Sequence, residues 1–196
     1  GVGLDVKSSY SAADGIGLSI STLQAAAAWN AINNGGIYTK PRFIKSIEFP
    51  DGSVKHVEPI RHRAMNASTA YVLSQMLRGV LARGYTGYQG SISKYSGYAA
   101  KTGTVWLPEG SKAKDVYGSG GTDAWFDSIT KDGYAISLWF GYDNPNKSPQ
   151  VADNNFGYQH LGRDLQLELT GNKSSIANWS EPNGVRNLGG SGLDAD

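Results

Sequence analysis

The sequence of 196 residues contains no cysteine, which excludes disulfide bonds, catalysis by a thiolate and cysteine-based zinc sites. Histidine is scarce as well. His56, His62 and His160 are the three histidines of the chain, and none stands in an HExxH motif or in a comparable ligand spacing. We therefore expect neither a metal ion nor a cofactor.

Long apolar runs and a strong charge of one sign are also missing. The longest apolar run is far shorter than the roughly 20 residues of a membrane-spanning helix, and no signal peptide opens the chain. The net charge is +1 and the lysines and arginines are scattered, so no nucleic acid is expected as a partner. The length suffices for one domain with a real core. Since the chain begins with Gly1 rather than Met, we expect a piece of a longer protein.

The first half of the sequence predicts a helix, a hairpin and a second helix. Ser19, Ser21 and Thr22 offer N-caps for a helix that ends at Gly35 and Gly36. A hairpin follows, with a turn at Asp51-Gly52. The second helix starts near residue 66 and ends at Gly84. Its predicted core stripe, in which methionine serves as core filler, consists of Val72, Leu73, Met76, Leu77, Val80 and Leu81.

The second half predicts three antiparallel strands and a short helix. Two apolar runs beginning at Thr122 and Tyr134 are separated by an Asp-Gly turn and follow the strand 98–106. The helix covers 156–170. The fold class is therefore α+β, with α/β layering of an antiparallel sheet and helices on both of its faces. We expect residues 1–170 to form the domain and residues 171–196 to be a Gly/Ser/Asn-rich tail or linker, with Trp179 docking on the domain.

The stretch "YAAKTGTVW", residues 98–106, carries the chemistry. A lysine ammonium and two threonine hydroxyls, from Lys101, Thr102 and Thr104, can hold a carboxylate. Gly103 in the middle of a strand marks a place where a ligand backbone can come very close. A free backbone N–H nearby can face a developing oxyanion. The alternative is a plain Lys-Thr turn on the surface.

Several blocks together resemble the penicillin-recognising serine transpeptidases, in particular the C-terminal half of the transpeptidase domain of class A (bifunctional) penicillin-binding proteins. The blocks occur in the order expected of that family. They are "SISTLQAAAAWNAINNGGIYTKPRFIKSIEFPDGSV", "STAYVLSQMLRGVLARG", "AAKTGT" and "TDAWFDSITKDGYAISLWFGYDNP". The resemblance covers about residues 15–150.

The resemblance implies a role for each residue of the motif. Lys101 would hold the polar network of the site, and Thr102 and Thr104 would bind the carboxylate of a peptidoglycan stem peptide ending in D-Ala-D-Ala or of a β-lactam antibiotic. Gly103 would let the ligand lie close, and the backbone N–H of Thr104 would form half of the oxyanion hole. Trp106, which follows the motif, would wall the site.

The family's nucleophile motif, Ser-x-x-Lys, is not found where it should be, and Ser-x-Asn does not occur. The literal matches Ser91 with Lys94 and Ser111 with Lys114 fall in polar loops, whereas the family places its nucleophile at the start of a buried helix. We interpret both matches as chance. The nucleophile would then come from an upstream segment of the same protein, and this fragment alone would be inactive.

The function expected from the resemblance is part of a D,D-transpeptidase that cross-links peptidoglycan stems and is acylated by β-lactams. The intact protein would also carry a glycosyltransferase domain and an N-terminal membrane anchor, which places this domain on the extracytoplasmic side of the bacterial cell membrane. Two alternatives stay open. One is a non-catalytic scaffold that kept the fold, and the other is a serine D,D-carboxypeptidase or β-lactamase that shares the motif.

Overall fold

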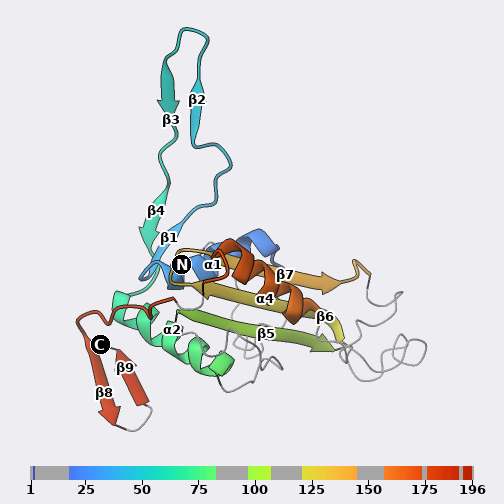
Figure 1. Ribbon diagram of the computed structural model, residues 1–196, viewed down its shortest axis with the longest axis vertical. Coiled ribbons are helices and arrows are strands. Elements are labelled where there is room, and N and C mark those ends of the chain that lie inside the picture. Colours follow the sequence, from blue (N-terminus) through green and yellow to red (C-terminus); the bar gives the residue numbers. More distant parts are fainter. Residues whose placement is uncertain are drawn as a thin grey trace.

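The computed structural model describes residues 2, 18–82, 97–106, 121–144, 157–173, 176–189 and 192–195. A three-stranded antiparallel sheet with the order β5-β6-β7 forms its centre (Figure 1). The strands are β5 (Tyr98–Trp106), β6 (Gly121–Thr130) and β7 (Ala135–Gly141). Among the described residues, every helix is too short or too polar to cross a lipid bilayer.

Three helices pack on this sheet. The helix α1 (Thr22–Asn33) contacts β6 and β7, α2 (Ala67–Ala82) contacts β5, and α4 (Gly157–Leu169) contacts β6 and β7. One core cluster joins Ala99, Ile129 and Trp179 to side chains of α1 and α2, and a second joins Phe126 to Tyr158 of α4. Since Phe126 and Ile129 belong to opposite faces of β6, the predicted α+β class with helices on both faces of an antiparallel sheet is confirmed.

The local signals that predicted α1 act as expected. Ser21 is the N-cap, and it forms a capping box with Gln24, whose backbone N–H donates to the Ser21 hydroxyl. The chain leaves the helix through Gly35 and Gly36, which have φ values of 60° and 86°. Both conformations are strained for any residue with a Cβ, so the two glycines end this helix.

The helix α2 corrects one prediction. Met76 is 63% exposed, so it is not core filler, whereas Leu81 is buried and Leu77 is partly buried. The stripe on α2 is therefore narrower than the sequence pattern suggested, because α2 contacts the sheet along a single edge strand, β5.

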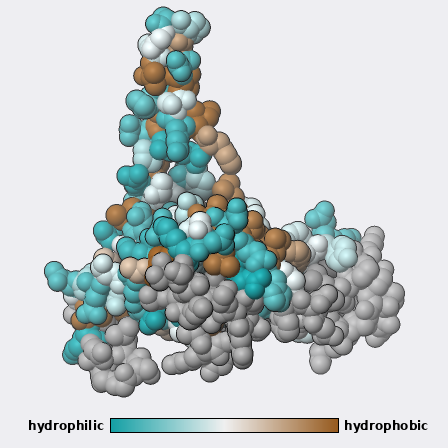
Figure 2. All heavy atoms as spheres, in the orientation of Figure 1, coloured by the Kyte–Doolittle hydropathy of each residue, from teal (hydrophilic) through white to brown (hydrophobic). Residues whose placement is uncertain are grey.

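An arm, residues 37–63, rises from the body of the molecule (Figure 1). Its base is the pair β1 (Ile37–Thr39) and β4 (Arg61–Arg63), and its tip is the predicted hairpin of β2 (Ser46–Glu48) and β3 (Val54–His56). Hydrophobic residues lie interspersed with hydrophilic ones along the arm (Figure 2). The exposed large apolar side chains of the arm are Phe43, Ile44, Ile47, Phe49, Val54 and Ile60.

The C-terminal residues meet the domain at several points. Ile176 and Trp179 are buried in the two core clusters, and the Trp179 indole N–H donates to the Asn33 side chain at 2.9 Å. The strands β8 (Val185–Gly189) and β9 (Gly192–Ala195) then form a hairpin beside α2. Trp179 therefore docks on the domain, while the boundary between residues 170 and 171 stays a prediction.

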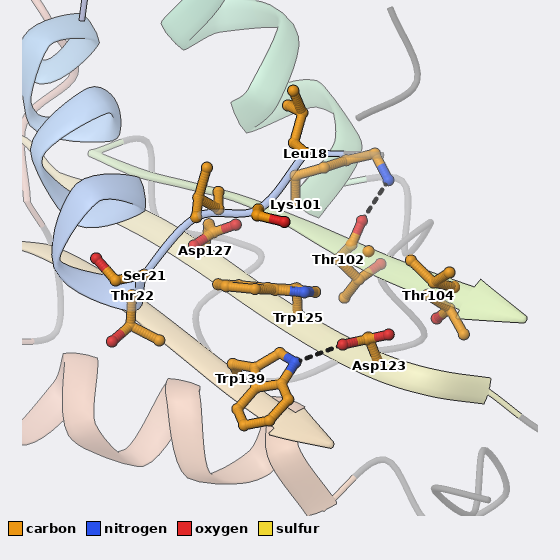
Figure 3. A pocket seen from close by; sticks show the side chains of 14 residues that line it. Leu18, Ser21, Thr22, Lys101, Thr102, Thr104, Asp123, Trp125, Asp127 and Trp139 are labelled. Carbon is orange, nitrogen blue, oxygen red and sulfur yellow. Dashed lines mark hydrogen bonds between the residues drawn. The ribbon is translucent and has the colours of Figure 1, made fainter. Parts of the chain in front are cut away.

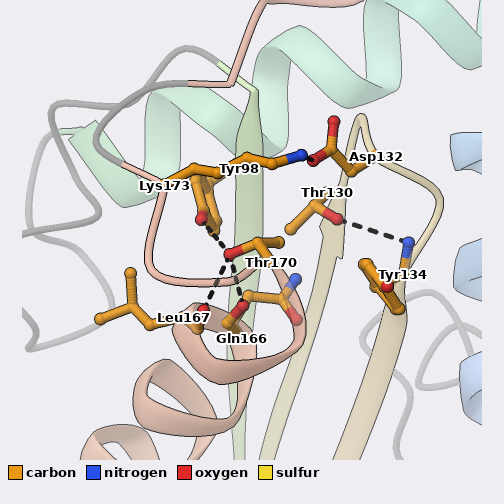
Figure 4. A network of polar contacts seen from close by, with 8 residues as sticks. All are labelled: Tyr98, Thr130, Asp132, Tyr134, Gln166, Leu167, Thr170 and Lys173. Carbon is orange, nitrogen blue, oxygen red and sulfur yellow. Dashed lines mark hydrogen bonds and ion pairs between the residues drawn. The ribbon is translucent and has the colours of Figure 1, made fainter.

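A polar network fixes the start of β5 to the end of α4 (Figure 4). The Tyr98 hydroxyl lies 2.8 Å from the Thr170 hydroxyl, which donates in turn to the Gln166 carbonyl at 2.9 Å. Nearby, Lys173 pairs with Asp132 in the turn between β6 and β7. Because Tyr98 is buried, these contacts hold the strand that leads to the Lys-Thr-Gly motif in place.

Candidate active site

A pocket of about 910 Å³ opens on the face of the sheet that carries α1 (Figure 3). Its walls come from the segment before α1, from the first turn of α1, from the second half of β5, and from β6 and β7. The lining residues are Leu18, Ser19, Ile20, Ser21, Thr22, Lys101, Thr102, Gly103, Thr104, Val105, Asp123, Trp125, Asp127 and Trp139.

The strand β5 borders this pocket as the edge of its sheet. It pairs with β6 on one side, and within the described residues no strand pairs with its other side. The residues from Tyr98 to Ala100 are buried, but Lys101 and Thr104 are exposed. The structure thus brings Lys101, Thr102, Gly103 and Thr104 together on one wall of the pocket, with backbone groups at a free sheet edge beside them.

The alternation of β5 distributes the four side chains. Lys101 and Gly103 stand on the same face of the sheet as Asp127 and Trp125, their direct partners on β6. Thr102 and Thr104 belong to the opposite face by alternation, yet they also line the pocket because β5 is at the border of the sheet. A ligand lying along this edge can therefore meet the ammonium and both hydroxyls.

Gly103 is not required by the packing of the sheet. A Cβ built at this position would lie 3.4 Å from Cβ of Trp125, which is an ordinary packing distance. The backbone of Gly103 also has a conformation that other residues adopt readily. The packing of the sheet thus gives no reason for a glycine here, and close approach of a ligand from the pocket stays a prediction.

The pocket residues of β6 and β7 come from strands that the sequence predicted as parts of the sheet, without a role in the site. Asp123, Trp125 and Asp127 share one face of β6, and Trp139 stands across from Trp125 on β7. The Trp139 indole N–H donates to Asp123 at 2.8 Å, and the Thr122 hydroxyl donates to the second Asp123 oxygen at 2.7 Å. The alternation in "TDAWFDSI" shows that these residues share a face, but the sequence does not show that this face meets a pocket.

Asp127 carries the perturbed carboxyl group of the pocket. Burial raises the pKa of Asp127 to about 6, and the nearby Ser137 hydroxyl opposes this shift. Its Oδ1 atom is buried and makes no hydrogen bond within the described part of the chain. Lys101 lies opposite Asp127 on β5, but its ammonium donates to the carbonyl of the next residue, Thr102, at 2.8 Å (Figure 3). Asp127 was missed by the sequence analysis.

Trp106 lies at the end of β5, beyond a shift in the pairing register with β6. Its side chain is 51% exposed, and it is not among the residues that line the pocket. Ser91, Lys94, Ser111 and Lys114 lie outside the described residues. The Ser21 hydroxyl, although it lines the pocket, serves as the cap of α1.

The arrangement can bind a carboxylate and can place backbone donors beside a reacting carbonyl. A cation, two hydroxyls and an open strand edge lie along one wall, and two tryptophans with ring centroids 6.4 Å apart form part of the floor. Acyl transfer additionally needs a nucleophile with an activating base, and the described residues show no such pair.

Comparison with known proteins gives one consistent family. Residues 3–162 match the family described as the penicillin binding protein transpeptidase domain. Penicillin-binding protein 1A of Streptococcus oralis is 37% identical over 152 residues, which are 76% of this chain but 23% of that protein. The chain therefore spans about a quarter of the length of this curated relative.

Solved structures agree with this result. The apo crystal structure of penicillin-binding protein 3 from Mycobacterium tuberculosis has a TM-score of 0.52 and 30% identity, covering 79% of this chain and 37% of that chain. The same protein in complex with ampicillin has a TM-score of 0.52 and 27% identity, covering 79% and 36%. The family resemblance and the transpeptidase-like fold expected from the sequence are confirmed.

Proposed function

Since the chain belongs to the family of penicillin-binding protein transpeptidase domains, we propose that it is part of a serine D,D-transpeptidase that cross-links peptidoglycan stem peptides. The observation that carries the proposal is the pocket wall formed by Lys101, Thr102, Gly103 and Thr104 at a free sheet edge. This wall offers a binding place for the carboxylate of a peptide ending in D-Ala-D-Ala.

Each residue of the wall has a proposed task. The Lys101 ammonium and the hydroxyls of Thr102 and Thr104 hold the terminal carboxylate of the stem. The backbone at Gly103 lets the stem lie along β5 as an added strand. The backbone N–H of Thr104 donates to the oxygen of the attacked carbonyl as charge develops on it. Trp106, which is exposed at the end of β5, covers the part of the substrate that lies farther from the terminal carboxylate.

The nucleophile is proposed to come from an upstream segment of the same protein. Its serine oxygen attacks the carbonyl of the penultimate D-Ala, the peptide bond breaks, and the terminal D-Ala leaves with a proton on its amine. The amine of a second stem peptide then attacks the acyl-enzyme and releases the serine. A β-lactam enters the same pocket, and opening of its ring leaves it on the serine. The ampicillin complex of the M. tuberculosis relative supports this part of the proposal.

The class A assignment extends the proposal to the whole protein. It rests on a relative named penicillin-binding protein 1A and implies a glycosyltransferase domain and a membrane anchor upstream. The domain would then act on the extracytoplasmic side of the cell membrane. Within this chain, we propose residues 1–170 as the C-terminal half of the transpeptidase domain and residues 171–196 as its tail or linker.

A fluorescent penicillin tests this function directly. The intact protein should become covalently labelled, and the label should be lost after pretreatment with unlabelled ampicillin. Residues 1–196 alone should remain unlabelled because the nucleophile is missing. An intact protein that takes no label would instead be a non-catalytic scaffold.

Product analysis separates the remaining alternative. With a stem peptide as donor and a peptide amine as acceptor, a transpeptidase forms the cross-linked dimer. A carboxypeptidase or β-lactamase releases only the hydrolysed product, because water takes the place of the amine.

A further inference from the structure

Two aspartates on the pocket face of β6 differ in their surroundings. Both oxygens of Asp123 accept hydrogen bonds, one from the Trp139 indole and one from the Thr122 hydroxyl. The Oδ1 atom of Asp127, four residues further along, is buried and accepts none within the described residues. Asp123 therefore links β6 to β7 through the Trp139 indole, whereas Oδ1 of Asp127 makes no such link among the described residues.

The position of Asp127 points to Lys101 as its partner. The two residues are direct cross-strand partners in the antiparallel pairing of β5 and β6, and both line the pocket. Side chains in such a pair have Cβ atoms about 4.5–5.5 Å apart, which the four-carbon stem of a lysine spans easily. Ser137 faces Asp127 from β7, and its hydroxyl opposes the rise in the pKa of Asp127 that burial causes.

Lys101 has a second position available. Its ammonium lies at the Thr102 carbonyl, along the exposed border of the sheet, rather than across the ladder at Asp127 (Figure 3). Since Lys101 is exposed, a change of side-chain rotamer can carry the ammonium from the border to the pocket floor without moving the backbone. There it would compensate the charge of a carboxylate that burial otherwise disfavours.

We propose that Asp127 is a positioning residue for Lys101. Its carboxylate accepts a hydrogen bond from the Lys101 ammonium and holds the cation on the pocket floor, where the cation also faces the incoming substrate carboxylate. The inference rests on the proposed function, since it assigns the residue that orients the carboxylate-binding lysine of that site.

A pH dependence follows from this pairing. Burial raises the pKa of Asp127 to about 6, and an ammonium beside it lowers that pKa again. Below its pKa the carboxyl is protonated and no longer holds the cation, so acylation should decrease as the pH falls. In the described part of the chain the charged groups on this face of the pocket are Lys101 and Asp123. The facing residues of α1 and β7, including Ser21 and Ser137, are uncharged.

Acylation rates of the intact protein test the pairing. The second-order rate with a fluorescent penicillin is measured between pH 5 and 8 for the wild type, for Asp127→Asn, and for Asp127→Glu. We expect Asp127→Asn to lower the rate about tenfold at pH 7.5 and to remove the decrease towards pH 5. Asp127→Glu should restore part of the rate at pH 7.5 and part of the decrease towards pH 5. Glu48→Gln, which removes a carboxylate from the exposed arm, is the matched control and should behave as the wild type.

A double-mutant cycle identifies the partner. If Asp127 acts through Lys101, then Asp127→Asn should have no further effect in a Lys101→Met background, because the cation that it positions is gone. Losses that add up in the double variant would overturn the proposal, and so would a wild-type rate and pH profile in Asp127→Asn.

One measurement does not depend on acylation. The difference in urea midpoint between the wild type and Asp127→Asn, followed against pH, reports the pKa of Asp127 in the folded intact protein. This pKa should rise when Lys101→Met removes the partner. An unchanged pKa would disprove the pairing even if penicillin labels the protein, whereas a protein that takes no label but shows the rise would contradict only the proposed function.

Discussion

Two antiparallel hairpins of this chain share a turn sequence and have different surroundings. The hairpin of β2 and β3 turns at Asp51-Gly52, and the hairpin of β6 and β7 turns at Asp132-Gly133. Both turn glycines have positive φ, 80° and 101°. Phe126 of β6 is 1% exposed, however, and Phe43 of the arm is 89% exposed. Local sequence thus specifies a hairpin, and packing decides whether it becomes a core sheet or an arm.

The reason for the difference is the number of covered faces. Helices lie on both faces of the pair β6 and β7, whereas residues of β2 and β3 are exposed throughout. A functional site needs side chains held in one position, and a sheet packed on two sides provides them. This is consistent with the location of the pocket on the central sheet and not on the arm.

Matched phenylalanine substitutions test this comparison most strongly. Phe126→Ala removes a buried ring between the sheet and α4, and we expect it to lower the free energy of unfolding by about 3–5 kcal/mol. Phe43→Ala should change it by less than about 0.5 kcal/mol. Urea unfolding of the intact protein, followed by tryptophan fluorescence, measures both. A large loss for Phe43→Ala would show that another part of the intact protein covers the arm.

Substitutions of polar and charged residues test where the function lies. Lys101→Ala or Thr102→Ala should slow acylation of the intact protein by fluorescent penicillin about 100-fold, which corresponds to about 2.7 kcal/mol, because carboxylate binding is lost. The fold should survive. Lys55→Ala, on the arm, is the control and should leave the rate unchanged. Equal rates for all three variants would remove the Lys-Thr-Gly wall from the site.

Glycine-to-alanine substitutions, one in the arm and one in the body, test where the backbone conformation requires a glycine. Gly52→Ala places a Cβ at a φ of 80°, and we expect a loss of about 1 kcal/mol although no neighbour lies within 4 Å. Gly79→Ala, inside α2 and also without a neighbour within 4 Å, should gain about 0.5–1 kcal/mol because alanine favours a helix. Thermal unfolding of both variants checks the opposite signs.

The smallest expected effect concerns the Ser-x-x-Lys matches at Ser91 and Ser111. Ser91→Ala and Ser111→Ala should leave penicillin acylation of the intact protein as it is, because the nucleophile that we propose lies upstream. Abolished labelling in either variant would place the nucleophile inside this chain.

Much of the fold was predictable because its signals are local. The capping box at Ser21, the glycines after α1 and the Asp-Gly turns all act within a few residues, and the structure shows each of them. The exposure of Met76 was not predictable, since it depends on which elements pack against α2 and on which side of it. Residues of the site were predictable only where a compact motif carries them, as for Lys101 to Thr104. Asp127 enters the pocket because β6 pairs with β5, which places Asp127 opposite Lys101, a residue that comes much earlier in the chain.

By itself, the sequence determined the helices, the hairpins and the family, because capping, alternation, turn glycines and motif order are properties of short stretches. The tertiary structure alone decided that β5 is an edge strand, that Asp127 faces Lys101, and that the arm stays uncovered in this chain. Those facts depend on which segments distant in sequence pack together, and the patterns within short stretches do not reveal such packing.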